Sequence, residues 1–130
     1  MKILVGYDGS EASLKAVNIS VKYAKAFNAQ ILLVTSLAAA VKDNGNEAQH
    51  AQEEFETIKD LFAKENIPCG TDLVISGLSA GEDIVGYALE NQVDHIILGI
   101  KKKSRTGKLL FGSNAQHVIL GAHCPVITVN

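Results

Sequence analysis

The residues best suited to holding a ligand lie in one stretch, GIKKKSRTGKLLFGS, which runs from Gly99 to Ser113. Cationic side chains are concentrated there, although the whole chain has a formal net charge of -2. They are Lys101, Lys102, Lys103, Arg105 and Lys108. Gly112 and Ser113 precede a run with helical character, and free N–H groups at a helix start attract anions. The pattern predicts a phosphate site; the alternative is a solvated basic loop followed by an ordinary glycine–serine helix cap.

The glycines of this stretch complete neither of the common phosphate-binding motifs. A P-loop requires G-x-x-x-x-G-K-[ST]. If Gly107 and Lys108 were its glycine–lysine pair, Lys102 would replace the first glycine and Leu109 the hydroxyl residue. A dinucleotide-binding fingerprint requires G-x-G-x-x-G after the first strand, and residues 6–10, GYDGS, do not supply it. A phosphate site in this chain must therefore be built in another way.

Apolar runs and amphipathic segments alternate along the chain and predict the elements that position this stretch. Short apolar, β-branched runs are typical of strands buried on both faces of a parallel sheet. The predicted strands are 2–7, 31–37, 69–76, 93–100 and 125–129. Apolar residues at helical spacing predict the helices between them. The first helix is capped by Ser10 and stops at Asn28, the second covers 47–65, the third starts near Ser79 or Gly81, and the fourth covers 114–120.

This order predicts an α/β fold, an open five-stranded parallel sheet with helices on both faces. The 130 residues suit a single domain, residues 1–130. In such folds ligands bind outside the carboxyl ends of the strands, near the point where the strand order reverses. Three loops qualify, namely 6–10, 36–40 and the stretch from Gly99 onward. The basic stretch is therefore placed where a ligand is expected.

Composition argues against several classes of partner. The net charge of -2 gives no reason to expect binding to nucleic acid or to an anionic membrane. No apolar stretch approaches the roughly 20 residues that a membrane-spanning helix needs. Cys69 and Cys124 lie far apart and lack a metal-type spacing, so they are expected to be reduced thiols. With no visible signal peptide, these features predict a cytoplasmic protein.

Candidate catalytic and metal-binding residues are few. His117 and His123 are six residues apart, whereas a metal pair on one helix needs a spacing of four, so no metal site is predicted. No acid–base pair or nucleophilic triad stands out, and we predict that the protein is not an enzyme. An enzyme acting on a phosphorylated metabolite has little support for the same reason. Asp8 is either a ligand contact or a turn residue that caps the first helix.

The whole chain resembles the universal stress protein family, in its single-domain, UspA-like form. KILVGYDGSEAS resembles the opening strand and Asp-Gly-Ser turn of the family, and VDHIILG resembles its fourth strand. GKLLFGSNAQHVILGAHCPVITV resembles its closing glycine–serine helix and Cys-Pro-Val strand. The resemblance implies a Rossmann-like fold of the adenine nucleotide alpha hydrolase-like kind.

Nucleotide-binding members of that family carry the signature G-x2-G-x9-G-[ST], and its spacing is preserved from Gly99 to Gly112 and Ser113. Lys102 stands at the middle glycine, and Asn114–Ala115 replaces the Val-Ser/Thr often found there. The resemblance assigns the adenosine to Asp8 and the backbone near Gly6, and the ribose and phosphates to the motif ends; it implies that the strand exit near Ser36 offers backbone contacts to adenine. The implied nucleotide-binding set is Gly6, Asp8, Ser36, Gly99, Lys102, Gly112, Ser113, Asn114 and Ala115.

The resemblance implies a stress-related regulatory protein that binds ATP, or AMP or ADP, with Mg²⁺ entering only together with the nucleotide. Any ATP hydrolysis should be slow, because no activating base or P-loop is visible. The apolar final strand, 125–129, would be a pairing liability at a sheet edge, and the resemblance implies that it pairs with its twin in a homodimer. The alternative is a nucleotide-free dimeric protein-interaction module of the same family, which Lys102 favours.

Overall fold

A computed structural model describes residues 1–37, 45–101 and 112–130 of the chain. Its strands are β1 (Lys2–Gly6), β2 (Gln30–Ser36), β3 (Cys69–Val74), β4 (His95–Gly99) and β5 (Val126–Val129). Its helices are α1 (Glu11–Phe27), α2 (Asn46–Lys64), α3 (Ala80–Glu90) and α4 (Ser113–Gly121). The predicted order of strands and helices is confirmed, with ends that shift by one or two residues. Lys102, the rest of the basic loop to residue 111, and residues 38–40 lie outside the described residues.

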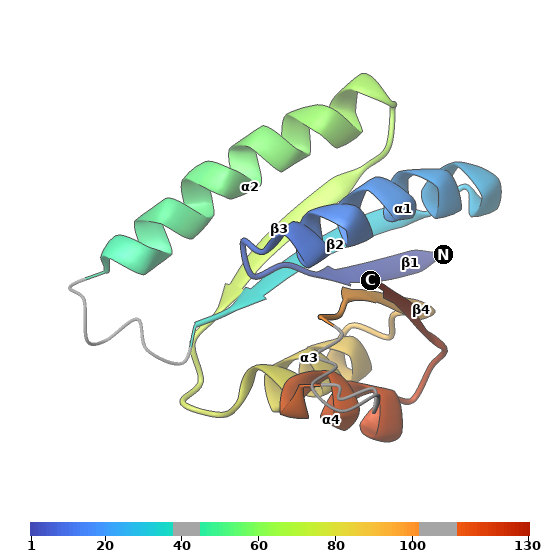
Figure 1. The fold of residues 1–130 in the computed structure, drawn as a ribbon. Helices are drawn as coiled ribbons and strands as arrows, with labels where there is room; N and C mark the ends of the chain where they lie inside the picture. Colours follow the sequence, from blue (N-terminus) through green and yellow to red (C-terminus); the bar gives the residue numbers. More distant parts are fainter. Residues whose placement is uncertain (38–44, 102–111) are drawn as a thin grey trace.

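The five strands form one parallel sheet in the order β3-β2-β1-β4-β5. Figure 1 shows α1 and α2 on one face of the sheet and α3 and α4 on the other. The predicted α/β fold with helices on both faces is therefore confirmed. The strand order reverses between β1 and β4, since the chain adds β2 and β3 on one side of β1 and the later strands on the other. This reversal puts the expected ligand position outside the carboxyl ends of β1 and β4.

Local sequence explains where the helices begin and end. The Ser10 side chain accepts a hydrogen bond from the backbone N–H of Ser13 and caps α1. The same helix ends at Asn28, whose left-handed backbone, φ 52°, asparagine tolerates better than most residues. For α3 the cap is Ser79, which accepts from the N–H of Glu82, so the choice left open between Ser79 and Gly81 is settled.

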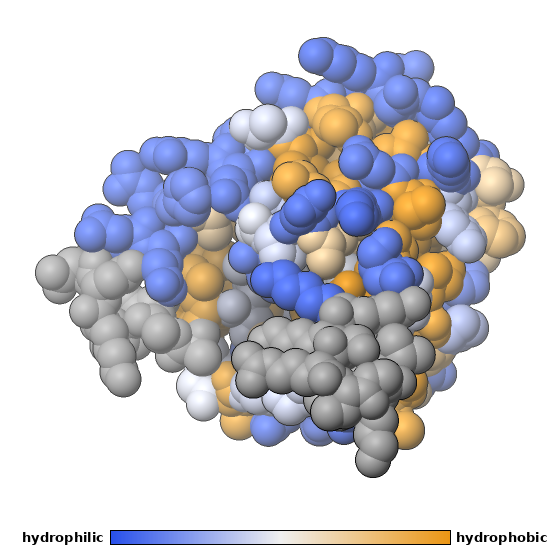
Figure 2. Space-filling model, viewed as in Figure 1, coloured by the Kyte–Doolittle hydropathy of each residue, from blue (hydrophilic) through white to orange (hydrophobic). Residues whose placement is uncertain are grey.

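The sheet separates two apolar cores. The core beneath α1 and α2 contains large, fully buried side chains, among them Phe55 and Phe62. The core beneath α3 and α4 is made of smaller residues, including Ile84, Ala88 and Val118. Figure 2 shows mostly hydrophilic side chains on the outer side of α2, with hydrophobic ones beneath them next to the sheet. This two-sided character is what the amphipathic pattern of 47–65 predicts.

Among the described residues, one strand at each end of the sheet has a neighbouring strand on one side only. β5, the predicted pairing strand, lies at one edge beside β4, and β3 lies at the other. The edge position is a precondition of the predicted homodimer, which itself stays a prediction. No helix in the described part of the chain is both long enough and apolar enough to cross a membrane.

Candidate functional site

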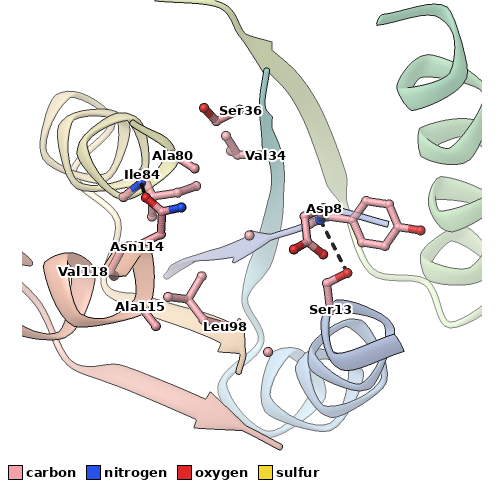
Figure 3. Close-up of a pocket in the computed structure, with 14 residues that line it drawn as sticks. Asp8, Ser13, Val34, Ser36, Ala80, Ile84, Leu98, Asn114, Ala115 and Val118 are labelled. Atoms are coloured by element: carbon pink, nitrogen blue, oxygen red, sulfur yellow. Dashed lines mark hydrogen bonds between the residues drawn. The ribbon is translucent and has the colours of Figure 1, made fainter. Parts of the chain in front are cut away.

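A cleft of about 130 Å³ opens at the carboxyl ends of β1, β2 and β4. Figure 3 shows Asp8 and Ser13 on one side of it and, on the other, residues of α3 and α4, including Ile84 and Asn114. The position is the one that the strand order predicts for a ligand. A cleft with apolar walls and a few convergent polar groups is the usual form of a small-molecule site.

Six of the nine residues predicted from the sequence line this cleft. They are Gly6, Asp8, Ser36, Gly99, Asn114 and Ala115. Gly112 and Ser113 are exposed and do not line it; they form the cap and first residue of α4, next to Asn114. The structure thus brings together segments far apart in the sequence, while their binding of a nucleotide stays a prediction.

Asp8 stabilises the turn before α1 and also lines the cleft. Its Oδ1 accepts a hydrogen bond from the backbone N–H of Ser10 at 2.9 Å, and its own N–H donates to Ser13 Oγ at 3.4 Å. Figure 3 shows its carboxylate directed into the cleft. Partial burial acts to raise the pKa of Asp8, but the hydrogen bonds from Ser10 and Ser13, with nearby Lys101, outweigh it and lower the pKa. Asp8 therefore presents a negative charge to a ligand.

The start of α4 places backbone N–H groups that have no partner within the helix at the edge of the cleft. Gly112 caps the helix without a side-chain hydrogen bond, and the first N–H groups of any helix have no partner within it. The backbone of Gly112 (φ -62°, ψ 156°) is open to any residue, and a Cβ there would meet no atom within 4 Å. Neither conformation nor packing within the described protein therefore requires glycine at this position. Close approach of a ligand would require it.

Gly99 differs from Gly112, because the fold itself requires it. A Cβ on Gly99 would lie 2.1 Å from the backbone oxygen of Ala12, at the start of α1. The chain of β4 and the first turn of α1 thus pass too close for any side chain. The first glycine of the signature is needed for packing, whether or not a ligand also uses it.

A buried carboxylate beside the cleft was missed in the sequence. Asp83 on α3 is only 6% exposed. It accepts hydrogen bonds from the hydroxyls of Ser36, at 2.5 Å, and of Ser76. In the sequence, Asp83 is recognisable only as an acid in the first turn of the third helix, where a negative charge suits the helix dipole. Its signal was available in the helical spacing, since Ala80, Ile84 and Ala88 place Asp83 on the buried side of α3.

Asn114 joins the two helices that form this wall. Its Oδ1 accepts from the backbone N–H of Gly81 at 2.9 Å, as the dashed line in Figure 3 shows. The same figure shows the amide nitrogen of Asn114 turned toward the open cleft. A Cβ on Gly81 would lie 2.8 Å from the backbone oxygen of Asn114, so α3 and α4 meet without room for a side chain. Asn114 therefore makes a structural bond through its amide oxygen and turns its donor end toward the cleft.

A second hollow, of about 350 Å³, adjoins the cleft on the α2 side and shares Tyr7 and Asp8 with it. Its polar side chains already bond to one another. Glu54 Oε1 lies 2.8 Å from His50 Nε2, and burial, followed by a hydrogen bond to Glu54, raises the pKa of Tyr7 to about 12. Among the described residues no group of three potential metal ligands occurs. This hollow is therefore a weaker candidate than the cleft.

Comparison with known proteins identifies proteins that are similar to this chain in sequence and in structure. A model of the universal stress protein family matches residues 1–130. A universal stress protein of Methanocaldococcus jannaschii is 29% identical, over 98% of this chain and 81% of the relative. The structure of a universal stress protein from Archaeoglobus fulgidus has a TM-score of 0.86 and 28% identity, over 100% of this chain and 93% of that one. A structure of the Archaeoglobus protein in complex with dAMP has a TM-score of 0.83 and 26% identity, over 100% and 98%. These likenesses confirm the Rossmann-like fold.

Proposed function

The chain belongs to the universal stress protein family, and from this premise we propose that it binds an adenine nucleotide, ATP, ADP or AMP, in the cleft. The observation that carries the proposal is the convergence of Asp8, Ser36, Gly99 and Asn114 in one cleft at the strand reversal. A relative of similar fold, 26% identical to this chain, was solved with dAMP, which supports an adenine nucleotide as the ligand.

Each part of a nucleotide has a matching surface in the cleft. Val34 and Ile84 offer apolar walls for the base, in the part of the cleft that also contains Ser36. The Asp8 carboxylate accepts hydrogen bonds from the ribose hydroxyls. The phosphates extend toward the start of α4, where free N–H groups and the positive end of the helix favour anions. Because Asp8 is negative, the phosphates must lie away from it.

The glycine at position 112 supports this orientation. No atom of the described protein lies where its side chain would be, and its backbone angles suit any residue. A phosphate lying against the first turn of α4 would explain the glycine, because the ligand then approaches the backbone closely. Since the bond donors are backbone groups, no side chain of a P-loop is needed.

The direct test is thermal unfolding of the purified protein with and without millimolar Mg-ATP. A ligand that binds only the native state raises the free energy of unfolding, by about 2.7 kcal/mol at 100 times its dissociation constant. We expect the melting temperature to rise by several degrees. Nucleotide released from freshly purified, denatured protein would identify the natural ligand. No rise at millimolar ATP, ADP or AMP, together with no released nucleotide, would overturn the proposal.

A pair of matched variants locates the site. Gly112→Val should abolish the shift with ATP while the unliganded protein melts almost as before, because a Cβ at this position meets no atom of the described residues within 4 Å. Gly86→Val on α3 is the control, since a Cβ there also meets no atom within 4 Å and Gly86 does not line the cleft. Equal shifts in the two variants would place the ligand elsewhere.

Regulation rather than catalysis completes the proposal. Mg²⁺ enters with the nucleotide. ATP hydrolysis is slow or absent, because the described residues that line the cleft include neither a P-loop nor a base placed to activate water. The β5 edge pairs with its twin in a homodimer, which would cover an apolar edge strand. Sedimentation of the purified protein tests the dimer: a monomer at micromolar concentration would remove this part of the proposal.

A nucleotide-free interaction module is the second candidate, and the lysine at the middle motif position favours it. The variant Lys102→Gly separates the two functions. If the wild-type protein binds no nucleotide and the variant does, the natural chain has lost the ligand and the module is supported. If both bind ATP with similar affinity, Lys102 is compatible with the nucleotide and the module loses its support.

A further inference from the structure

We propose that Asp83 sets the base specificity of the cleft by fixing which way the Ser36 hydroxyl bonds. With its only hydrogen given to Asp83, Ser36 accepts a hydrogen bond from the 6-amino group of adenine and disfavours 6-oxo purines. This inference rests on the proposed nucleotide site and adds a specificity-determining pair to it. Ser36 lines the cleft, whereas Asp83 is buried behind it and acts through Ser36.

The first step is the bond that commits one oxygen of Asp83. Ser76 Oγ accepts a hydrogen bond from the backbone N–H of Leu78 at 3.1 Å, so its own hydrogen is free to be donated. That hydrogen goes to Oδ1 of Asp83, the neighbouring acceptor. The second oxygen, Oδ2, remains for the Ser36 hydroxyl, 2.5 Å away.

The second step is the direction of the Ser36 bond. Asp83 lies in the first turn of α3, where the positive end of the helix favours a carboxylate. An ionised carboxylate only accepts, and a hydroxyl carries one hydrogen and two acceptor sites. Ser36 must therefore donate to Asp83. What it can offer to the cleft is an acceptor, and Figure 3 shows Ser36 beside Val34 and Ala80, at the end of the cleft assigned to the base.

The third step is the chemistry of the base. Adenine carries an amino group at position 6, which donates, whereas hypoxanthine and guanine carry an oxygen there, which only accepts. A 6-oxo purine would face the Ser36 oxygen acceptor to acceptor. Turning the hydroxyl toward the ligand would take a hydrogen bond from a carboxylate that is 6% exposed. Both outcomes disfavour the oxo base, because a buried polar group is left unpaired.

The experiment compares ATP with ITP, which have the same sugar and phosphates and differ in the base, at position 6 and at N1, which accepts in adenine and carries a hydrogen in hypoxanthine. Titration calorimetry on the full chain measures both dissociation constants, and their ratio is the readout. The wild-type protein is expected to prefer ATP by at least about tenfold. A merely structural defect would weaken both ligands together, so the ratio reports on specificity and not on folding.

Three variants test the pair. In Asp83→Asn, the amide oxygen takes the Ser76 hydrogen and the amide N–H₂ faces Ser36, which frees the Ser36 hydrogen for the ligand. The ATP preference should then fall toward unity or reverse. Ser36→Ala should also bring the ratio toward unity. Ser76→Ala is the matched control, because it removes the other hydroxyl on Asp83 but does not line the cleft, and it should keep the wild-type ratio.

The outcomes separate this inference from the proposed function. A wild-type ratio near unity, or a ratio unchanged in both Asp83→Asn and Ser36→Ala, would overturn the specificity pair while the nucleotide site stands. Absence of binding by both nucleotides to the wild-type protein would overturn the two together. A lower ratio in Asp83→Asn and Ser36→Ala, with Ser76→Ala unchanged, supports the pair.

Discussion

The two faces of the sheet are covered to different extents. Helices α1 and α2 have 17 and 19 residues, whereas α3 and α4 have 11 and 9. At about 1.5 Å per residue, the second pair is much shorter along the sheet. The core of the α1–α2 face is packed by large side chains such as Phe55 and Phe62, and the second hollow lies at the start of α2, while the α3–α4 face has smaller side chains and forms one wall of the cleft.

The two faces also differ in what their buried or bonded polar side chains contact. On the α1–α2 face, Ser20 Oγ donates to the backbone oxygen of Val17, within its own helix. On the α3–α4 face, Asp83 bonds to the cleft residue Ser36, and Asn114 bonds across to Gly81 while it lines the cleft. The first face stabilises the fold. The second carries polar groups that reach the cleft, whose opposite wall is supplied by Asp8 and Ser13.

The largest expected effect comes from removing a large side chain in the core of the α1–α2 face. Phe62→Ala should lower the free energy of unfolding by about 3–5 kcal/mol, because Phe62 is fully buried. Val118→Ala on the other face should cost about 2 kcal/mol, since it deletes two methyl groups. Urea unfolding measures both.

Ligand binding sharpens the same comparison. The gain in stability with saturating ATP should persist in Phe62→Ala, if that variant is still folded at low temperature, and shrink in Val118→Ala, because only Val118 lines the cleft. Equal costs for the two substitutions, or loss of the ATP effect in Phe62→Ala alone, would contradict the division between a stabilising and a recognising face.

The fold could be predicted from the sequence because its signals are local. Apolar runs such as ILLVTS mark strands that are buried on both faces, and Ser10 and Asn28 mark the ends of α1 by their capping chemistry. The position of the site followed from the alternation of strands and helices, since a parallel sheet gathers its loops at one edge. Six of the nine expected site residues met in the cleft for that reason.

The side-chain bonds could not be predicted, because they depend on distances between segments far apart in the chain. Asp83 and Ser36 are separated by 47 positions, and nothing in either local sequence names the other. Glycines show the same limit. Gly99 and Gly112 occupy equivalent places in a motif, yet only the structure shows that packing demands the first and leaves the second without a packing reason.

The contact between α3 and α4 gives the next largest effect. Gly81→Ala would bring a methyl group to 2.8 Å from the backbone oxygen of Asn114 and 3.0 Å from Cβ of His117. Overpacking of this kind costs about 1–3 kcal/mol. Because the cleft lies between these helices and the first turn of α1, we expect Gly81→Ala to weaken ATP binding as well as the fold.

Gly86→Ala on the same helix is the control for this substitution. A Cβ at Gly86 meets nothing within 4 Å, and alanine favours a helix over glycine by about 1 kcal/mol. The control should therefore be at least as stable as the wild-type protein, with unchanged ATP affinity. If Gly81→Ala were equally stable and bound ATP normally, α3 and α4 would be able to move apart more easily than their contacts at Gly81 indicate.

The smallest expected effect concerns the charge of Asp8, which lines the cleft. The pKa of Asp8 in the folded protein lies below its ordinary value of 3.8, so the folded state binds fewer protons than the unfolded chain. Asp8 therefore contributes stability above pH 3.8 that is lost as the pH falls through its folded pKa. Asp8→Asn lacks this contribution. Its melting temperature should therefore fall less steeply between about pH 5 and about pH 2, the range that surrounds the ordinary pKa of an aspartate. Parallel pH profiles for the two proteins would show that the Ser10 and Ser13 hydrogen bonds shape the turn without favouring the charged form of Asp8.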